Sequence, residues 1–363
     1  MNDILKLARN DLKSLPPYIP GAYEEGFVRM NANESPWTSP GDSTERGLNI
    51  YPPPRPDSIN ACLSAQYSVT PDSLMVTRGT SEAIDLLIRG FCTAGRDQIL
   101  ICPPTFDMYR LYAGIQGAEV LTAPLLRAED PQKDFALDVP GILSTSTERT
   151  KLIFICTPNN PNGQVFSAAD VEAICRGVEG RSLVVIDEAY QEFSDTPSFR
   201  ALQDTFEHVV LLRTLSKFLA LAGVRCGALI GQSALIKLLA KVLPPYTFPT
   251  PSIELVMKAL TTESLNISEN RTALLRTERA RLAASLVSSP LVTKIWPSDA
   301  NFVLVATTNG QNFVKTVHRA GILVRTFPND PLLTDCVRIT VGRPEDNDRL
   351  LQAVSSEELT NGH

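Results

Sequence analysis

Short apolar runs alternate with longer amphipathic stretches through the middle of the chain. Between about residues 70 and 230, the apolar runs are rich in branched side chains, as buried strands are, and the stretches between them show helical spacing. They predict strands over 74–77, 98–102, 152–156, 183–186 and 209–212, and helices over 57–67, 83–92 and a segment through Tyr109 and Tyr112. Strands that alternate with helices predict an α/β fold with a mostly parallel sheet.

The pattern changes after residue 230. A helix predicted over 233–243 ends at two prolines, and a long helix is predicted over 252–287. The last apolar runs, at 294–296, 300–305, 321–325 and 336–342, mix with helical stretches and indicate a smaller α+β layer. We predict an N-terminal arm that also contributes to the small domain (1–50), a large domain (51–250), a long connecting helix (251–287) and a small C-terminal domain (288–363).

Prolines dominate the predicted arm. Residues 15–21 hold three prolines and a glycine, and the stretch 31–36 ends in a further proline, so we expect this segment to run extended over a surface and not as a regular helix. Tyr51 precedes consecutive prolines, which either fix the position of its hydroxyl or only pack against its ring. A long arm of this kind is expected to pack on a partner subunit.

Composition excludes several classes of function. The 363 residues carry a net charge of −6 with a pI of about 5.3, so nucleic acid is not an expected partner. No apolar run is long enough to span a membrane and the start does not resemble a signal peptide, so we expect a cytoplasmic protein. The seven cysteines form no CxxC pair and there are three histidines, so neither a disulfide framework nor a metal site is expected.

Lys217 is the first candidate for chemistry. It follows the strand at 209–212 and lies between the hydroxyl residues Thr214 and Ser216 and the later Arg225. Hydroxyls and a guanidinium can hold a phosphate, while a lysine beside them can form a Schiff base with pyridoxal phosphate. A lysine between a strand and a helix is more often a solvated surface residue, so this interpretation needs support from other stretches.

Asp187 supplies such support, because it follows four buried apolar residues directly. A carboxylate in that position is unfavourable unless it is paired, and a protonated pyridine nitrogen is a suitable partner. Tyr190 could then reach the phenolic oxygen of the same ring. The turn-rich loop after the strand at 152–156 presents two side-chain amides, including that of Asn160, at a strand end.

Three further stretches each have a functional and a structural interpretation. Thr80 or Ser81 is predicted at a helix N-terminus, where free amides can bind phosphate, although capping alone is the commoner meaning. Phe106, just past a strand, could stack on a flat cofactor or belong to the core. Arg338 lies inside an apolar strand, where it needs either a substrate anion or a structural salt bridge.

With these residues in place, the chain resembles the pyridoxal-phosphate-dependent class I and II aminotransferases of fold type I, and within them the histidinol-phosphate aminotransferase group. The motifs that carry the resemblance follow one another along nearly the whole chain. They are Asn31-Ala32-Asn33-Glu34, Tyr51-Pro52, Arg78-Gly79, Cys102-Pro103-Pro104-Thr105, Pro158-Asn159-Asn160-Pro161, Asp187-Glu188-Ala189-Tyr190, Arg213-Thr214-Leu215-Ser216-Lys217, Ala222-Gly223-Val224-Arg225-Cys226-Gly227 and Arg338-Ile339-Thr340-Val341-Gly342.

The resemblance implies a fold, a cofactor and a set of roles. It implies a large domain with a mostly parallel seven-stranded sheet, a smaller α+β domain, and a homodimer that converts an amino donor and 2-oxoglutarate. The catalytic residues it implies are Lys217, Asp187 and Tyr190. Further cofactor-binding residues would be Thr80, Ser81, Phe106, Asn160, Thr214, Ser216, Arg225 and Tyr51, the last from a second subunit; substrate-binding residues would be Tyr18, Asn33, Asn160, Arg325 and Arg338.

Other functions stay open at this point. An aminotransferase for aromatic or other amino acids and a threonine-phosphate decarboxylase share this scaffold, and carbon dioxide release would distinguish the decarboxylase. A non-catalytic cofactor-binding regulator is disfavoured, because no DNA-binding segment is appended and Lys217 is present with its partners. A nucleotide-binding protein is disfavoured because neither GxxxxGK[ST] nor a strand-linked GxGxxG occurs.

Overall fold

A seven-stranded sheet forms the centre of the large domain. The computed structural model describes residues 4–24 and 26–355. The strands are β1 (Leu74–Thr77), β2 (Gln98–Ile101), β3 (Glu119–Thr122), β4 (Thr150–Cys156), β5 (Leu183–Asp187), β6 (Val209–Thr214) and β7 (Gly227–Ile230), in the order β1-β7-β6-β5-β4-β2-β3. Only β7 runs antiparallel to its neighbours, β1 and β6. The predicted mostly parallel α/β sheet is confirmed.

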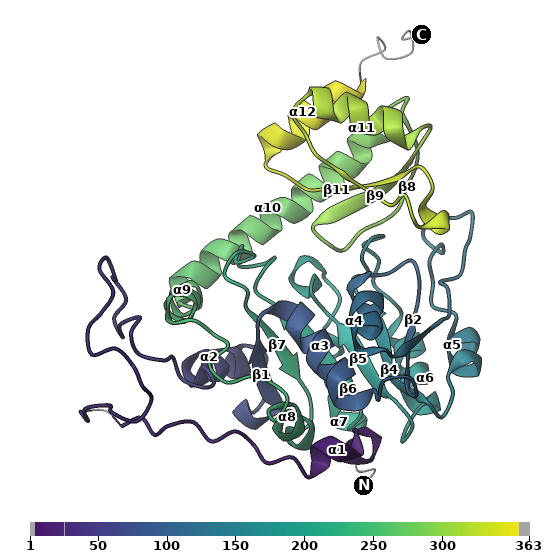
Figure 1. Ribbon diagram of the computed structural model, residues 1–363. Helices are drawn as coiled ribbons and strands as arrows, with labels where there is room; N and C mark the ends of the chain where they lie inside the picture. The colour runs from purple at the N-terminus through teal and green to yellow at the C-terminus, as the bar shows by residue number, and fades with distance from the viewer. Residues whose placement is uncertain (1–3, 25, 356–363) are drawn as a thin grey trace.

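Helices cover both faces of this sheet (Figure 1). They are α2 (Asp57–Gln66), α3 (Gly79–Phe91), α4 (Met108–Gln116), α5 (Val139–Thr145), α6 (Ala168–Gly177), α7 (Leu202–Thr205) and α8 (Ser233–Leu239), with short 3-10 turns η2 (Pro71–Ser73), η3 (Gln191–Phe193) and η4 (Phe199–Ala201). Successive strand residues point to opposite faces of the sheet and pack in two different hydrophobic clusters. Ile153 and Val184 belong to the cluster on one face, and Leu152 and Val185 belong to the cluster on the other. Burial on both faces explains the unbroken apolar runs of the sequence.

The small domain is a second layer above the sheet (Figure 1). Its antiparallel strands β8 (Val292–Ile295), β9 (Phe302–Thr307), β10 (Arg325–Thr326) and β11 (Cys336–Thr340) lie in the order β10-β11-β9-β8, with α11 (Gly310–Arg319), α12 (Pro344–Ser355) and η5 (Pro331–Leu333). Leu282, Phe313 and Val337 belong to its hydrophobic core. Of the strand predicted over 321–325, only Arg325 is in β10.

The single helix predicted over 252–287 is wrong, because two helices occupy this stretch. They are α9 (Thr250–Ala259) and α10 (Thr262–Leu286), and the chain turns between them. Thr261 adopts extended backbone angles, and its side chain accepts a hydrogen bond from the Ser264 amide. A threonine that caps a new helix in this way satisfies a free backbone amide and ends the preceding helix.

Asp134 ties the small domain to the loop between β3 and α5. Its carboxylate is fully buried and accepts hydrogen bonds of 2.8 Å from Arg127, from Lys294 Nζ and from Trp296 Nε1. Burial opposes ionisation, but these donors prevail and hold the pKa of Asp134 well below its ordinary value. The contacts join residues more than a hundred positions apart, and they fix β8 against the large domain.

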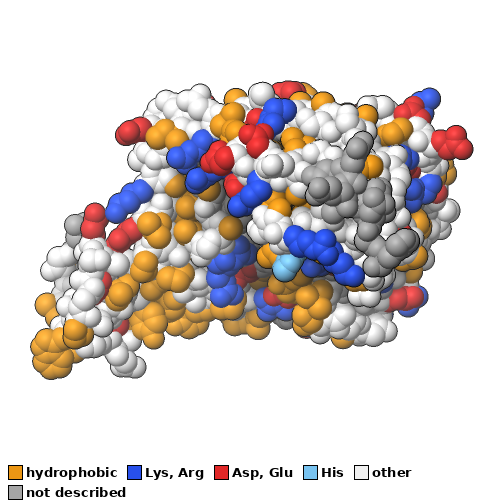
Figure 2. All heavy atoms as spheres, turned by 90° about the horizontal axis from the view of Figure 1, so that it is seen from above, with side chains coloured by type: hydrophobic (Ala, Val, Ile, Leu, Met, Phe, Trp, Pro, Cys, Tyr) orange, Lys and Arg blue, Asp and Glu red, His pale blue; other side chains and the backbone are white. Residues whose placement is uncertain are grey.

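The N-terminal segment divides into a packed start and a projecting arm. The turn η1 (Ile4–Leu7) and α1 (Asn10–Lys13) pack on the large domain, where Ile4 joins the core beside α8. The chain then extends away from the domains without regular structure until α2 (Figure 1). Figure 2 shows hydrophobic side chains gathered on this projecting end.

The boundaries predicted for the arm, the large domain, the connecting helix and the small domain stay a prediction.

Within residues 4–24 and 26–355, no helix has both the length and the apolar composition needed to cross a bilayer.

Candidate active site

The predicted site residues come together at one edge of the large sheet. The carboxyl ends of β1, β4, β5 and β6 meet there, and Asn160, Asp187 and Lys217 follow three of these strands. The small domain lies above this edge (Figure 1). A cleft of about 660 Å³ is lined by residues of both domains. Phe106, Asn160, Arg325 and Arg338 are among the residues that line it. A crevice at the carboxyl ends of parallel strands is the usual ligand position in such folds.

Asp187 is the most buried charged group of the site, with 1% of its surface exposed. Its Oδ2 accepts a 2.8 Å hydrogen bond from the Tyr109 hydroxyl, and its Oδ1 accepts one of 3.2 Å from the Ala189 amide. Burial raises the pKa of Asp187 to about 6. No ion pair joins it to a lysine or arginine of the described chain, so it has room for a cationic partner.

A chain of hydrogen bonds crosses the cleft from the small domain to the large one. Arg338 donates to Asn160 Oδ1, and Asn160 Nδ2 donates to the Tyr190 hydroxyl at 3.3 Å. Tyr190 is buried and meets the ring of Phe302 edge-on at 5.2 Å. Burial raises the pKa of the Tyr190 phenol, so this hydroxyl stays protonated at neutral pH.

Two arginines face each other at the small-domain end of this series of hydrogen bonds. Arg325 and Arg338 are direct partners on the neighbouring strands β10 and β11, and both line the cleft. Burial together with the charge of Arg325 lowers the pKa of Arg338, which shows that the two positive charges repel. Like charges directly opposite on a sheet are unfavourable unless an anion lies between them. The pair therefore forms a site for an anionic group.

Lys217, in the loop after β6, lies near Tyr190 at the end of this chain of hydrogen bonds. Its Nζ lies 6.0 Å from the centre of the Tyr190 ring. Desolvation, with Arg338 and Arg225 as positive neighbours, lowers the pKa of the Lys217 amine. An amine with a lowered pKa is unprotonated for a larger fraction of the time, which suits it to act as a nucleophile or base.

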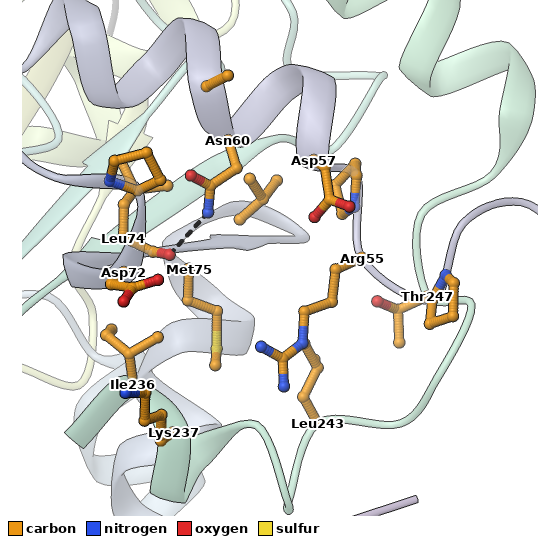
Figure 3. Close-up of a pocket in the computed structure, with 15 residues that line it drawn as sticks. Arg55, Asp57, Asn60, Asp72, Leu74, Met75, Ile236, Lys237, Leu243 and Thr247 are labelled. Carbon is orange, nitrogen blue, oxygen red and sulfur yellow. Dashed lines mark hydrogen bonds between the residues drawn. The ribbon is translucent and has the colours of Figure 1, made fainter. Parts of the chain in front are cut away.

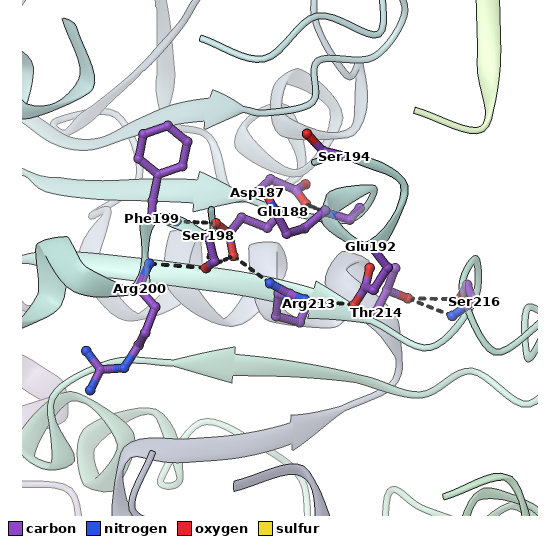
Figure 4. Close-up of polar contacts among 12 residues, drawn as sticks. Asp187, Glu188, Glu192, Ser194, Ser198, Phe199, Arg200, Arg213, Thr214 and Ser216 are labelled. Atoms are coloured by element: carbon purple, nitrogen blue, oxygen red, sulfur yellow. Dashed lines mark hydrogen bonds and ion pairs between the residues drawn. The ribbon is translucent and has the colours of Figure 1, made fainter. Parts of the chain in front are cut away.

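Thr214, Ser216 and Arg225 form a polar cradle beside Lys217, part of which is drawn in Figure 4. Thr214 Oγ1 bonds Ser216 Oγ at 3.0 Å, and Arg225 donates to Ser216 Oγ at 3.4 Å and to the Arg78 carbonyl at 3.5 Å. Gly79 has a φ of +74°, and a Cβ there would lie 2.7 Å from the Arg225 guanidinium. Only glycine therefore lets Arg225 lie across the start of α3.

Thr80 and Ser81 lie in the first turn of α3, and the prediction that one of them caps this helix is wrong. Gly79 is the first helical residue and Arg78 occupies the cap position, without a side-chain cap bond. Instead the Glu82 carboxylate accepts a hydrogen bond of 2.7 Å from the backbone amide of Arg78. The helix start, with its partial positive charge, nevertheless borders the Arg225 cradle as expected for an anion site.

Phe106 lies where the sequence placed it, in the loop after β2 and in the wall of the cleft. Its ring meets Tyr109 edge-on at 5.6 Å and is partly buried against the core of the sheet. One ring face toward the cleft would suit stacking on a planar ligand.

The structure does not bring Tyr51, Tyr18 and Asn33 to this cluster. Tyr51 stacks on Tyr246 at 4.7 Å, and Tyr18 meets the same ring edge-on at 6.4 Å. The side chains of Tyr18 and Tyr51 are 62% and 47% exposed, and Asn33 lies exposed on the arm. Among the described contacts of one chain, none joins these three residues to Lys217 or Asp187.

Two buried groups beside the site, Tyr109 and Arg213, have no functional signal in the sequence. Tyr109, the partner of Asp187, is three positions after Phe106 and reads in the sequence as an ordinary helical aromatic. Arg213 donates to Glu188 at 2.8 Å and to Glu192 at 2.7 Å, as Figure 4 shows. This ion network joins the strand ends that carry Asp187 and Lys217, and a buried charge without such partners would be unfavourable.

A second cavity, of about 310 Å³, lies away from these residues, between α2, η2 and α8 (Figure 3). Arg55, Asp57, Asp72 and Lys237 line it, and Asn60 donates to the Leu74 carbonyl at 2.8 Å on its wall. It contains none of the predicted site residues, so the cleft between the domains is the candidate active site.

Comparisons with known proteins agree with this geometry. The family Aminotransferase class I and II matches residues 28–354. Histidinol-phosphate aminotransferase of Xanthomonas campestris pv. campestris (strain 8004) is 38% identical over 358 residues, 98% of each chain, and that of Xylella fastidiosa (strain 9a5c) is 39% identical over 351 residues, 96% of this chain and 95% of the relative.

A solved structure supports the fold independently. The crystal structure of the histidinol-phosphate aminotransferase from Clostridium acetobutylicum matches with a TM-score of 0.77 at 23% identity, over 87% of this chain and 92% of that one. This likeness concerns the fold, and it confirms the predicted combination of a parallel-sheet domain with a smaller domain. From its sequence match over nearly the whole length, and from the site just described, the chain belongs to the class I and II aminotransferase family.

Proposed function

We propose that this chain transfers the amino group of L-histidinol phosphate to 2-oxoglutarate, with pyridoxal phosphate as cofactor, giving imidazole acetol phosphate and L-glutamate. The observation that carries the proposal is the facing pair Arg325 and Arg338 in the cleft, with Lys217 close enough for the charge of Arg338 to lower its pKa. Both substrates are anions, and one arginine pair can hold either. The names of the relatives support this choice of amino donor.

The residues at the carboxyl ends of the strands, together with the cleft residues Phe106 and Asn160, fit pyridoxal phosphate. Asp187 is a buried carboxylate without a cationic partner, which suits a protonated pyridine nitrogen. The cradle of Thr214, Ser216 and Arg225, with Thr80 and Ser81 in the adjoining helix start, suits the phosphate. We assign the ring face to Phe106 and the ring oxygen to Asn160 and Tyr190, whose amide and hydroxyl already bond each other.

When bound, the cofactor supplies an electron sink for the pair of electrons released as the α-proton of the substrate leaves. Lys217 Nζ would hold the cofactor, and the same amine would move the α-proton as a general base. Its lowered pKa raises the fraction of the amine that is unprotonated and able to accept a proton. Asp187, kept ionised, holds positive charge at the opposite end of the site.

The small domain binds the anionic end of each substrate. Arg338 reaches Asn160 in the large domain, and Arg325 adds a second guanidinium on the next strand. Planar guanidinium groups match carboxylate and phosphate oxygens in two-bond geometry. We assign further substrate contacts to Tyr18 and Asn33 of the arm, which lie outside the cleft of their own chain.

We propose that the active form is a homodimer in which Tyr51 and Tyr18 complete the site of the partner subunit. The support is the arm, which exposes Ile19, Phe27 and Trp37 far from any core of its own chain. Exposed apolar surface of this extent marks an interface. Sedimentation velocity at micromolar concentration is expected to give about twice the 39.7 kDa of one chain, and a monomeric, fully active enzyme would refute the proposal.

We also propose a cytoplasmic location. All seven cysteines are free, and six of them are buried in the core. Free thiols of this number are typical of a reducing compartment.

The amino donor can be tested in a single half-reaction. When L-histidinol phosphate is added to the cofactor-loaded protein without 2-oxoglutarate, the visible absorption of the bound cofactor is expected to bleach at micromolar donor. L-Phenylalanine and O-phospho-L-threonine, the donors of the competing functions, should leave the band unchanged. Bleaching by phenylalanine would reassign the donor, and carbon dioxide release from phosphothreonine would make the chain a decarboxylase.

A further inference from the structure

Tyr109 makes the closest side-chain contact to the buried carboxylate of the site. It lies on α4 with none of its surface exposed, and its hydroxyl donates a 2.8 Å hydrogen bond to Asp187 Oδ2. Its ring is held by stacking on Phe154 at 4.6 Å and 15°, and by the edge of Phe106 at 5.6 Å. The hydroxyl therefore has one position, set by packing on both sides.

The other groups around Asp187 cannot replace this donor. The Ala189 amide bonds the other oxygen, Oδ1, at 3.2 Å. Three titratable groups are neighbours of Asp187: Cys156 at the end of β4, Tyr190 in the following turn and Glu188 next along the chain. The negative charge of Glu188 raises the pKa of Asp187. Burial raises the pKa of Cys156 and of Tyr190, so both are uncharged at neutral pH and neither stabilises the ionised carboxylate as a cation would. Among the described hydrogen bonds, Tyr109 gives the only one from a side chain to Asp187.

We propose that Tyr109 is a positioning residue for the transamination: its hydroxyl donates to Oδ2, fixes the orientation of the Asp187 carboxylate, and keeps that carboxylate ionised. This inference rests on the proposed function, because Asp187 matters to catalysis only as the partner of a pyridinium nitrogen. The hydrogen bond itself acts whether or not the cofactor is present.

Physical chemistry supports this role. Burial raises the pKa of Asp187 to about 6, while the bonds from Tyr109 and Ala189 oppose the rise. Without the phenol, the pKa would move further toward neutral pH. A protonated Asp187 carries no charge and could not hold a positive nitrogen in place, so the phenol protects the ionised form at working pH.

The test uses cofactor-free protein, in which no catalysis takes part. The native state binds more protons than the unfolded state between the ordinary carboxyl pKa and the raised one, so stability falls as pH rises through that window. Tyr109→Phe removes a hydrogen bond that lowers the pKa of Asp187, so the pH range over which stability falls extends to higher pH. We therefore expect the loss of melting temperature relative to wild type to be roughly twofold larger at pH 8 than at pH 5, because a hydrogen bond to a charged group is worth about twice one to a neutral group.

Two matched variants isolate the effect. Tyr112→Phe, on the same helix and with no bond to Asp187, should change melting temperature equally at both pH values. In an Asp187→Asn background, Tyr109→Phe should also act equally at pH 5 and pH 8, since no carboxylate remains to titrate. A pH-independent loss in the wild-type background, or a pH-dependent one in the Asn background, would overturn the inference.

The loaded enzyme gives a second readout. Tyr109→Phe should lower kcat by about tenfold, with KM for both substrates within about twofold of wild type, because the anion-binding arginines are untouched. An unchanged kcat would overturn the catalytic part of the inference. The half-reaction with L-histidinol phosphate tests the donor separately, so failure of that assignment leaves the kcat comparison valid with whichever donor is active.

Discussion

Replacing Lys217 with alanine is expected to lower turnover by about 10⁴-fold, the upper range for loss of a positioned general base. In the proposed mechanism, the variant lacks the amine assigned to cofactor attachment and to movement of the α-proton, while the residues assigned to the phosphate and to both substrates are unchanged. Steady-state kinetics would measure the loss. Borohydride reduction and mass spectrometry should find cofactor linked to Lys217 in the wild type and no linkage in the variant.

The Lys217 variant should lose activity without losing stability. Desolvation and the charges of Arg338 and Arg225 lower the pKa of Lys217, so its charged form is disfavoured in the native state and the penalty is present at neutral pH. Cofactor-free Lys217→Ala should therefore melt at or above the wild-type temperature at pH 7. Lys217→Arg, which keeps the charge, should be as inactive as Lys217→Ala. Lys237→Ala, which removes a lysine from the other cavity, should keep full activity. Normal turnover of Lys217→Ala would exclude this lysine from the mechanism.

The sequence predicted five strands of the large sheet, to within two residues at their carboxyl ends, because burial on both faces leaves a clear signal; β3 and β7 were not among them. The run before Asp187 is entirely apolar, and a carboxylate at its end stands out. Lys217 lies three residues past the end of β6, whose first four residues are also apolar. Once the strands are parallel, their carboxyl ends must meet, so the approach of Asn160, Asp187 and Lys217 follows from topology.

The contacts that the sequence did not reveal join elements far apart along the chain. Tyr109 lies 78 positions from Asp187, and Arg338 lies 178 positions from Asn160. A buried tyrosine on a helix has the same local pattern whether its hydroxyl meets a carboxylate or a carbonyl. The break before Thr261 was missed for another reason, since the helical spacing continues on both sides of it.

The exposed arm shows a different limit. Tyr51 and Tyr18 were assigned to the site by resemblance, yet in one chain they pack on Tyr246 and stay partly exposed. A residue that acts across a subunit boundary cannot be placed from its own chain. Its role therefore depends on the dimer and stays a proposal.

Asp187→Asn is expected to weaken cofactor binding by about 10²- to 10³-fold and to remove most activity. The amide keeps the shape of the side chain and can still accept the Tyr109 hydroxyl, but it cannot pair with a positive nitrogen. Breaking a buried ion pair by removing one partner costs ~3–5 kcal/mol. Fluorescence titration of the cofactor-free variant would measure the affinity, and near-wild-type binding and turnover would remove Asp187 from the mechanism.

The same substitution should act in the opposite direction on the cofactor-free protein. A pKa raised from 3.8 to about 6 means that stability falls as pH rises through this range, and that the full penalty of roughly 3 kcal/mol is present above pH 6. Asp187→Asn should therefore raise the melting temperature of the cofactor-free chain at pH 8 and give little gain at pH 4. A carboxylate kept for packing alone would show neither the gain without cofactor nor the loss with it. Finding both would identify Asp187 as a group whose instability in the empty site is relieved by the positive charge it binds.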